Sequence, residues 1–144
     1  MTDPFDLERF VAAQDAGGTY QRALSEIRRG RKSSHWMWFV FPQIAGLGYS
    51  ATAQRYAIAG LDEARAYLDH PVLGPRLVEC AAALTRAAER SATEIFGGVD
   101  AQKLRSSMTL FSRAAPDEPV FARVLDLYFG GEADPETERR LPMP

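Results

Sequence analysis

The residues with the clearest capacity for chemistry are a run of positive charges that leads directly into a block of aromatic rings. Arg28, Arg29, Arg31 and Lys32 surround Gly30. Cationic side chains bind phosphate and flat rings stack on bases, so this order of residues is typical of an anion or nucleotide site. The alternative is that the arginines complement the negative end of a preceding helix, an effect of roughly 0.3 to 1 kcal/mol each. Arg31 and Lys32 lie beyond Gly30, where that helix is expected to end, so the helix end does not account for them.

The aromatic block covers residues 35–43 and reads His-Trp-Met-Trp-Phe-Val-Phe-Pro-Gln. It is apolar on both faces whether it is drawn as a strand or as a helix, so the fold must bury most of it. A core segment is the simpler interpretation, because aromatic side chains fill cores more often than they line sites. The alternative is that His35, Trp36, Trp38 and Gln43 contact a ligand.

A second polar cluster follows the pair Gly97-Gly98. Lys103, Ser106 and Ser107 are three and four residues apart, so they share one face of the helix expected there. A helix that begins after a glycine turn also offers free N–H groups to an anion, although caps and a solvated helix face explain the same residues. The glycine-lysine spacing of a P-loop is missing, and so is the strand that would precede it.

Standard catalytic and metal-binding patterns are not found. Cys80 falls beside an alanine-rich apolar stripe and is expected to be buried, and the two histidines have no zinc-site spacing. We therefore predict no catalytic residue, no metal and no cofactor.

The elements that must position these residues are helices. Apolar residues recur three and four positions apart along nearly the whole chain, and 144 residues suffice for one domain. The sequence predicts an all-α, compact single-domain bundle of about six to eight helices around the buried aromatic segment 35–43. The domain is expected to cover residues 1–131. Residues 132–144, which include three prolines, are expected to form a weakly tethered C-terminal tail.

Composition excludes several classes of protein. The longest apolar run, residues 36–41, is far shorter than the roughly 20 residues that cross a bilayer, so no membrane association and a cytoplasmic location are expected. One cysteine rules out an internal disulfide. The net charge of −2 argues against generic nucleic-acid binding but leaves room for a local basic patch.

Three stretches of the sequence together resemble a known family. They are Gly30-Arg31-Lys32, the block 35–43, and residues 46–50 with the sequence Gly-Leu-Gly-Tyr-Ser. They are similar to the signature of the bacterial family catalogued as domain of unknown function 1810, and Asp3-Pro4-Phe5, Ile95-Phe96-Gly97 and Lys103 with residues 106–111 agree with it. The resemblance covers roughly residues 3–131. It implies a compact, all-helical single domain and brings no established reaction, cofactor or catalytic residue.

The leading hypothesis is a small cytosolic module that binds a compact anionic ligand, such as a nucleotide or nucleotide-sugar. The ligand would lie between segment 31–43 and the helix near residues 100–107. The expected binding residues are Arg31, Lys32, His35, Trp36, Trp38, Gln43, Lys103, Ser106 and Ser107. Arg31 and Lys32 would neutralise phosphate and one of the tryptophans would stack, which requires the side chains of Arg31 and Lys103 to converge on one pocket.

Two alternatives stay open. One is a hydrolase acting on a nucleotide-type glycosidic bond, with His35 or Asp100 as general acid or base. The other is a protein-interaction module whose exposed aromatic or basic surface binds a partner.

Overall fold

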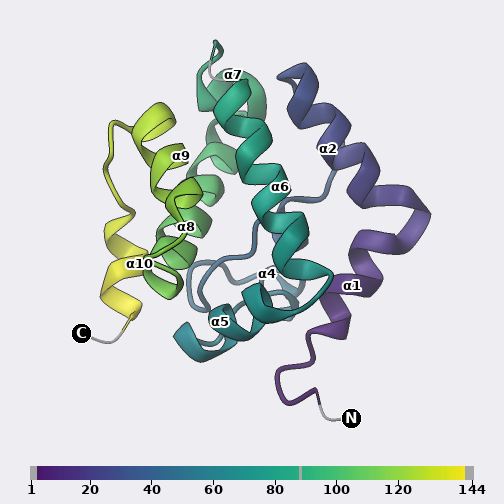
Figure 1. Ribbon diagram of the computed structural model, residues 1–144. Helices are drawn as coiled ribbons and strands as arrows, with labels where there is room; N and C mark the ends of the chain where they lie inside the picture. Colours follow the sequence, from purple (N-terminus) through teal and green to yellow (C-terminus); the bar gives the residue numbers. More distant parts are fainter. Residues whose placement is uncertain (1–2, 88, 142–144) are drawn as a thin grey trace.

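The computed structural model describes residues 3–87 and 89–141, and within these residues it contains helices and no strand (Figure 1). The longer helices are α1 (Glu8–Asp15), α2 (Thr19–Arg29), α5 (Leu61–Asp69), α6 (Leu73–Arg86), α8 (Gly98–Ala114) and α9 (Pro119–Phe129). The short ones are α3 (Met37–Val40), α4 (Ala51–Arg55), α7 (Ala92–Phe96) and α10 (Pro135–Arg140), and a 3-10 turn, η1 (Ala16–Gly18), joins α1 to α2. The all-helical prediction is confirmed.

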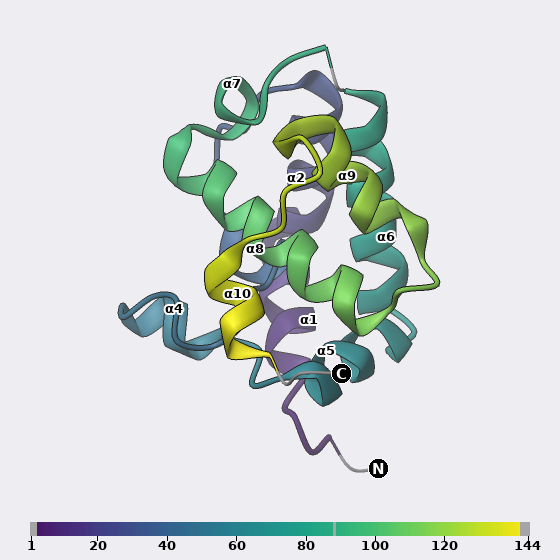
Figure 2. The same ribbon diagram turned by 90° about the vertical axis from the view of Figure 1, so that its left-hand side faces the viewer.

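Helix α8 is the centre of the bundle. It packs against α5, α7, α9 and α10, while α6 packs against α2, α5 and α9. Figure 2 shows α10 lying against the middle of α8, and α4 standing away from the other helices. In the described part of the chain, no helix combines the length and the apolar character that crossing a bilayer requires.

The apolar spacing of the sequence explains why these helices form where they do. In α2, Tyr20, Ala23, Leu24 and Ile27 occupy one face and all four are buried. The helix ends at Gly30, whose φ of 73° is a left-handed conformation that glycine adopts without steric cost.

The aromatic segment forms a large part of the core, as predicted. Trp36 is 1% exposed and Phe41 is completely buried, and both rings pack at an angle against Phe96 of α7. The segment is not buried throughout, because Trp38 is half-buried and His35 is exposed. The single helical turn α3 lies inside it, so most of the chain between α2 and α4 is irregular.

The expectation of a weakly tethered tail from residue 132 is wrong for residues 132–141. Helix α10 packs on α8, and Asp134 accepts a hydrogen bond from the backbone N–H of Thr137 at 3.0 Å, which caps the helix. Both residues are buried, and Arg113 of α8 forms an ion pair with Glu138 at 2.6 Å. Apart from Leu141, which packs against the core, these contacts are polar, so the apolar pattern of the sequence gave no sign of them. Residues 142–144 lie outside the described part.

Candidate functional site

A pocket of about 460 Å³ opens between the segment that follows α3, the first turns of α8 and the start of α10. Four of the residues predicted to bind a ligand line it: Trp38, Gln43, Lys103 and Ser106. The structure therefore brings the aromatic segment and the polar face of α8 together, as the sequence suggested. The third wall, formed by Asp134 and Glu136, was not predicted.

A smaller hollow of about 170 Å³ adjoins this pocket under the loop of residues 44–48. Trp38, Gln43 and Leu47 line both spaces, so they form a shared wall. Gly48 allows the loop to approach this wall and α4 closely, because a Cβ on it would lie 3.4 Å from the Trp38 ring and 2.8 Å from the Cβ of Ala53.

Lys103 carries the positive charge of the pocket. Its Nζ lies 4.0 Å from the centre of the Trp38 ring, which is a cation–π contact, and 3.1 Å from Oδ1 of Asp100. The other oxygen of Asp100 lies 2.9 Å from Nζ of Lys32. Burial raises the pKa of Asp100, but the hydrogen bonds and charges of Lys32 and Lys103 outweigh that effect and leave the pKa lowered. One ionised carboxylate is thus shared by two ammonium groups, so one positive charge is left over.

Gln43 contributes a buried hydrogen-bond donor that has no partner. The residue is 7% exposed and its Nε2 forms no hydrogen bond in the described structure. A buried amide that loses its hydrogen bonds to water costs about 1 to 3 kcal/mol, so such groups are rare and mark places where a ligand or water completes the structure. Because Gln43 lines the pocket, the side chain that carries this unpartnered donor borders any molecule bound there.

The carboxylate of Asp134 already accepts four hydrogen bonds from the protein. Its oxygens accept hydrogen bonds from Gln102 Nε2 at 2.9 Å, Ser106 Oγ at 3.1 Å, and the backbone N–H and hydroxyl of Thr137 at 3.0 and 2.6 Å. Asp134 therefore holds α10 onto α8 and forms a wall of the pocket. All four donors belong to the protein, and Ser106 is committed to this carboxylate.

Exposure alternates along residues 31–36, and this alternation separates the predicted site residues. Arg31 and His35 are exposed, whereas Lys32 points inward to Asp100 and Trp36 enters the core. Neither Arg31 nor His35 lines the pocket, so the predicted convergence of Arg31 and Lys103 is wrong. Successive side chains of a non-helical segment point in opposite directions, which explains why neighbouring residues differ.

Trp36 and Ser107 also lie outside the pocket. Trp36 is buried and its indole N–H donates to Glu26, so it cannot stack on a ligand. Ser107 is fully buried within α8 and its hydroxyl has no hydrogen-bond partner in the described structure.

Glu26 holds the segment that leads into the pocket, and the sequence analysis did not identify it. It is 1% exposed and accepts hydrogen bonds from the backbone N–H groups of Ser33 and Ser34 at 2.7 and 3.0 Å, the Ser34 hydroxyl at 2.5 Å and Trp36 Nε1 at 2.9 Å. Burial raises its pKa, but these four donors prevail and hold the pKa at about 2. Its position three residues after Ala23 of the buried stripe was the available signal.

The remaining titratable candidates form no second site. Cys80 is buried, and burial raises the pKa of its thiol to about 12, so it is not a thiolate at neutral pH. Within the described residues, no three His, Cys, Asp or Glu side chains are grouped to hold a metal ion.

These features define a small all-helical domain with a pocket lined by Lys103 and by the unpartnered amide of Gln43. The chain belongs to the family described as protein of unknown function DUF1810, whose sequence model matches residues 4–141 and so includes α10. It is similar to the crystal structure of the conserved hypothetical protein Rv1873 from Mycobacterium tuberculosis, with 51% sequence identity and a TM-score of 0.94 over 99% of this chain and 100% of the other. Among curated proteins, no significant match is found.

Proposed function

We propose that this protein binds a compact small molecule through an anionic, acceptor-rich group that contacts Lys103 and Gln43. The unpartnered amide of Gln43 carries this proposal, because it is a donor that the protein itself does not use. The proposal is made for a cytosolic protein, which the single free cysteine supports.

The hydrogen-bonding balance of the pocket sets the chemistry of the ligand. Lys103 has three N–H donors, and one of them is directed to Asp100. The carboxylates that line the pocket are engaged within the protein, since Asp134 accepts four hydrogen bonds and Glu136 forms ion pairs with Arg139 and Arg140. A ligand must therefore supply acceptors, and a carboxylate or phosphate group fits this better than a cation or a polyol.

The size of the pocket limits the ligand to a small molecule. About 460 Å³ lies within the range of roughly 300 to 1,000 Å³ that ligand pockets of proteins occupy. A nucleotide or nucleotide-sugar headgroup is the ligand class that we propose. Because Lys103 already covers one face of Trp38, a base would contact the other face or the edge of that ring.

No observation favours the alternatives as strongly. The lowered pKa of Asp100 keeps it ionised, which is unsuitable for a general acid at neutral pH, and the pairing of its two oxygens with Lys32 and Lys103 weakens it as a base. His35 lies outside the pocket. An interaction module would use exposed apolar side chains, and the large ones, Tyr49, Val99 and Leu127, belong to three different segments.

A thermal-shift screen with phosphate, nucleotides and nucleotide-sugars tests the proposal. A ligand at 100 times its dissociation constant stabilises the folded state by about 2.7 kcal/mol, which is roughly 5 to 10 °C for a domain of this size. We expect the shift to disappear in Lys103→Met and to persist in Arg123→Met, a matched control at an exposed position of α9. Equal shifts in both variants, or no shift with any compound, would refute the proposal.

A further inference from the structure

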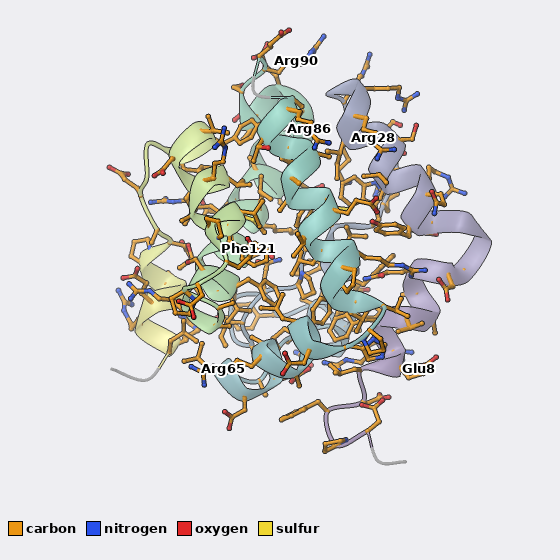
Figure 3. All side chains as sticks on the ribbon, viewed as in Figure 1. Glu8, Arg28, Arg65, Arg86, Arg90 and Phe121 are labelled. Atoms are coloured by element: carbon orange, nitrogen blue, oxygen red, sulfur yellow. The ribbon has the colours of Figure 1, made fainter. Side chains whose placement is uncertain are left out.

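The arginines that the pocket does not use lie at the end of the molecule where α2 and α6 both finish. Helix α2 ends in Arg28 and Arg29, and α6 ends at Arg86. Figure 3 shows Arg28, Arg86 and Arg90 at this same end. Arg31 follows α2 directly, and all five side chains are exposed. We refer to these five residues as the arginine surface.

The arginines at the end of α2 and those after α6 lie side by side, because Arg90 packs closely against the backbone at Gly30. The Cδ of Arg90 lies 3.2 Å from the position that a Cβ on Gly30 would occupy. Gly30 stands between Arg29 and Arg31 in the chain, so Arg90 lies beside the end of α2. The backbone N–H of Lys32 also donates to the carbonyl of Ile95 at 2.8 Å, which fixes the segment after Arg31 against α7.

The five arginines of the arginine surface form no ion pairs among the described residues, and they are grouped at one end of the molecule. Arg22, Arg55 and Arg123 also lack ion pairs there, but they lie on three different helices. Other arginines pair with acids, as in Arg113–Glu138 at 2.6 Å and Arg139–Glu136 at 3.0 Å. The acids in or next to the segments that carry these arginines are Glu26, Glu89 and Glu94. Glu26 binds the backbone N–H groups of Ser33 and Ser34, and Glu89 forms no ion pair among the described residues. The carboxylate of Glu94 accepts a hydrogen bond from the backbone N–H of Ser91 and is part of the cap of α7. Five arginines against these three acids leave an excess of two positive charges on a chain whose net charge is −2.

Helix ends explain only part of this excess. Positive charge in the last turn of a helix is favourable by roughly 0.3 to 1 kcal/mol per residue, which applies to Arg28, Arg29 and Arg86. Arg31 and Arg90 lie beyond the last turns. Gathering like charges is unfavourable without a counter-charge, so the arrangement indicates an anionic partner that lies outside the chain.

We infer that the arginine surface binds the phosphodiester backbone of a nucleic acid without reading its bases. One guanidinium group can donate two parallel hydrogen bonds to oxygens of the same phosphate. Five guanidinium groups at the ends of two helices therefore present several phosphate contacts at once. None of the large exposed apolar residues, Tyr49, Val99 and Leu127, belongs to the segments that carry these arginines. Protein partners need such apolar or aromatic anchors, and base stacking needs exposed rings, so a phosphate backbone fits this surface best.

Fluorescence anisotropy with labelled DNA and RNA duplexes of the same sequence tests this inference. The variant of the arginine surface is Arg28→Gln/Arg86→Gln/Arg90→Gln. The matched control, Arg22→Gln/Arg55→Gln/Arg123→Gln, removes the same charge from other exposed arginines. Each titration is repeated at several salt concentrations, and thermal unfolding verifies that both variants are folded.

We expect the wild type and the control to bind both duplexes, with affinity that falls as salt rises and a log–log slope of roughly −3 to −4, since each phosphate contact contributes about −0.9. The variant of the arginine surface should bind at least about tenfold more weakly. Its slope of log affinity against log salt concentration should be smaller in magnitude by two or more. If the affinity for the duplexes falls equally in both variants, the effect comes from net charge alone and the inference is overturned. Absence of binding at low salt, or tighter binding of a labelled poly-glutamate peptide than of either duplex, would overturn it too.

Discussion

Replacing Glu26 with glutamine removes the charge that orders the segment between α2 and α3. The four donors around Glu26 come from Ser33, Ser34 and Trp36, and together they fix the residues that precede Trp38 in the pocket. An amide is nearly the same size as a carboxylate, so Glu26→Gln tests charge and hydrogen bonding with little change in packing. Its NH₂ group must face surroundings made of donors, and only the Ser34 hydroxyl can turn to accept from it.

The magnitude follows from the pKa of Glu26. A pKa of about 2 in the folded protein against an ordinary value of 4.5 corresponds to on the order of 3 kcal/mol of stabilisation at 1.36 kcal/mol per unit. We discount this to about 2 kcal/mol because Ser33 is exposed and water screens that side of the site. For a domain of this size, the unfolding midpoint should fall by roughly 4 to 8 °C.

The effect should depend on pH in a defined direction. The pKa of Glu26 is lower in the folded than in the unfolded protein, so the unfolded state takes up the proton first as the pH falls. The stabilisation is therefore complete above about pH 4.5 and is lost as the pH falls towards 2. The difference in unfolding free energy between wild type and variant should be constant from pH 7 to 5 and should shrink below that range.

Urea unfolding followed by circular dichroism, at steps from pH 7 to pH 3, measures this difference. Glu89→Gln, at an exposed position without an ion pair among the described residues, is the control for the general loss of a carboxylate and should change stability by less than about 0.5 kcal/mol. The reasoning is refuted if Glu26→Gln costs no more than the control at pH 7. It is equally refuted if the difference does not shrink on acidification.

Three further predictions concern the pocket and the residues that support it. Gln43→Met removes the unpartnered amide, so thermal unfolding of the free protein should shift upward by a few degrees; a lower midpoint would show that the amide is satisfied. Asp100→Asn deprives Lys32 of its counter-charge, and urea unfolding should show a loss of about 1 to 3 kcal/mol, whereas unchanged stability would contradict the pairing. A chain ending at Gly131 lacks Asp134 and Glu136 and should lose every ligand-induced thermal shift; a retained shift would place the site elsewhere.

The helices and the core were predictable because they follow from local apolar spacing. The stripe of α2 and the buried residues Leu104, Met108 and Phe111 of α8 are visible in the sequence at three- and four-residue intervals. The aromatic block had to be buried in any fold, because exposing so much apolar surface to water is unfavourable. The grouping of Trp38, Gln43, Lys103 and Ser106 into one site rested instead on the chemistry of their residue types, and these four residues line one pocket.

Side-chain direction within the irregular segment was not predictable. Residues 31–35 are all polar, so no apolar alternation shows which of them face inward. Lys32 turns inward because Asp100, 68 positions later, supplies a carboxylate at 2.9 Å, and Arg31 consequently turns outward. Such a choice depends on a contact between distant segments, which a reading of local pattern does not contain.

The docking of α10 was missed for a related reason, and it changes how the pocket is understood. The helix offers no apolar stripe, and its attachment depends on Asp134, which meets Ser106 and Gln102 of α8. Arg140 at its other end donates to the carbonyl of Gly46 at 3.3 Å, in the loop beside the pocket. The C-terminal helix therefore touches both the α8 wall and the loop wall. A ligand that contacts α10, the α8 wall and the loop wall should stabilise α10 more than the rest of the fold. Hydrogen exchange at residues 135–140 should therefore slow when ligand binds.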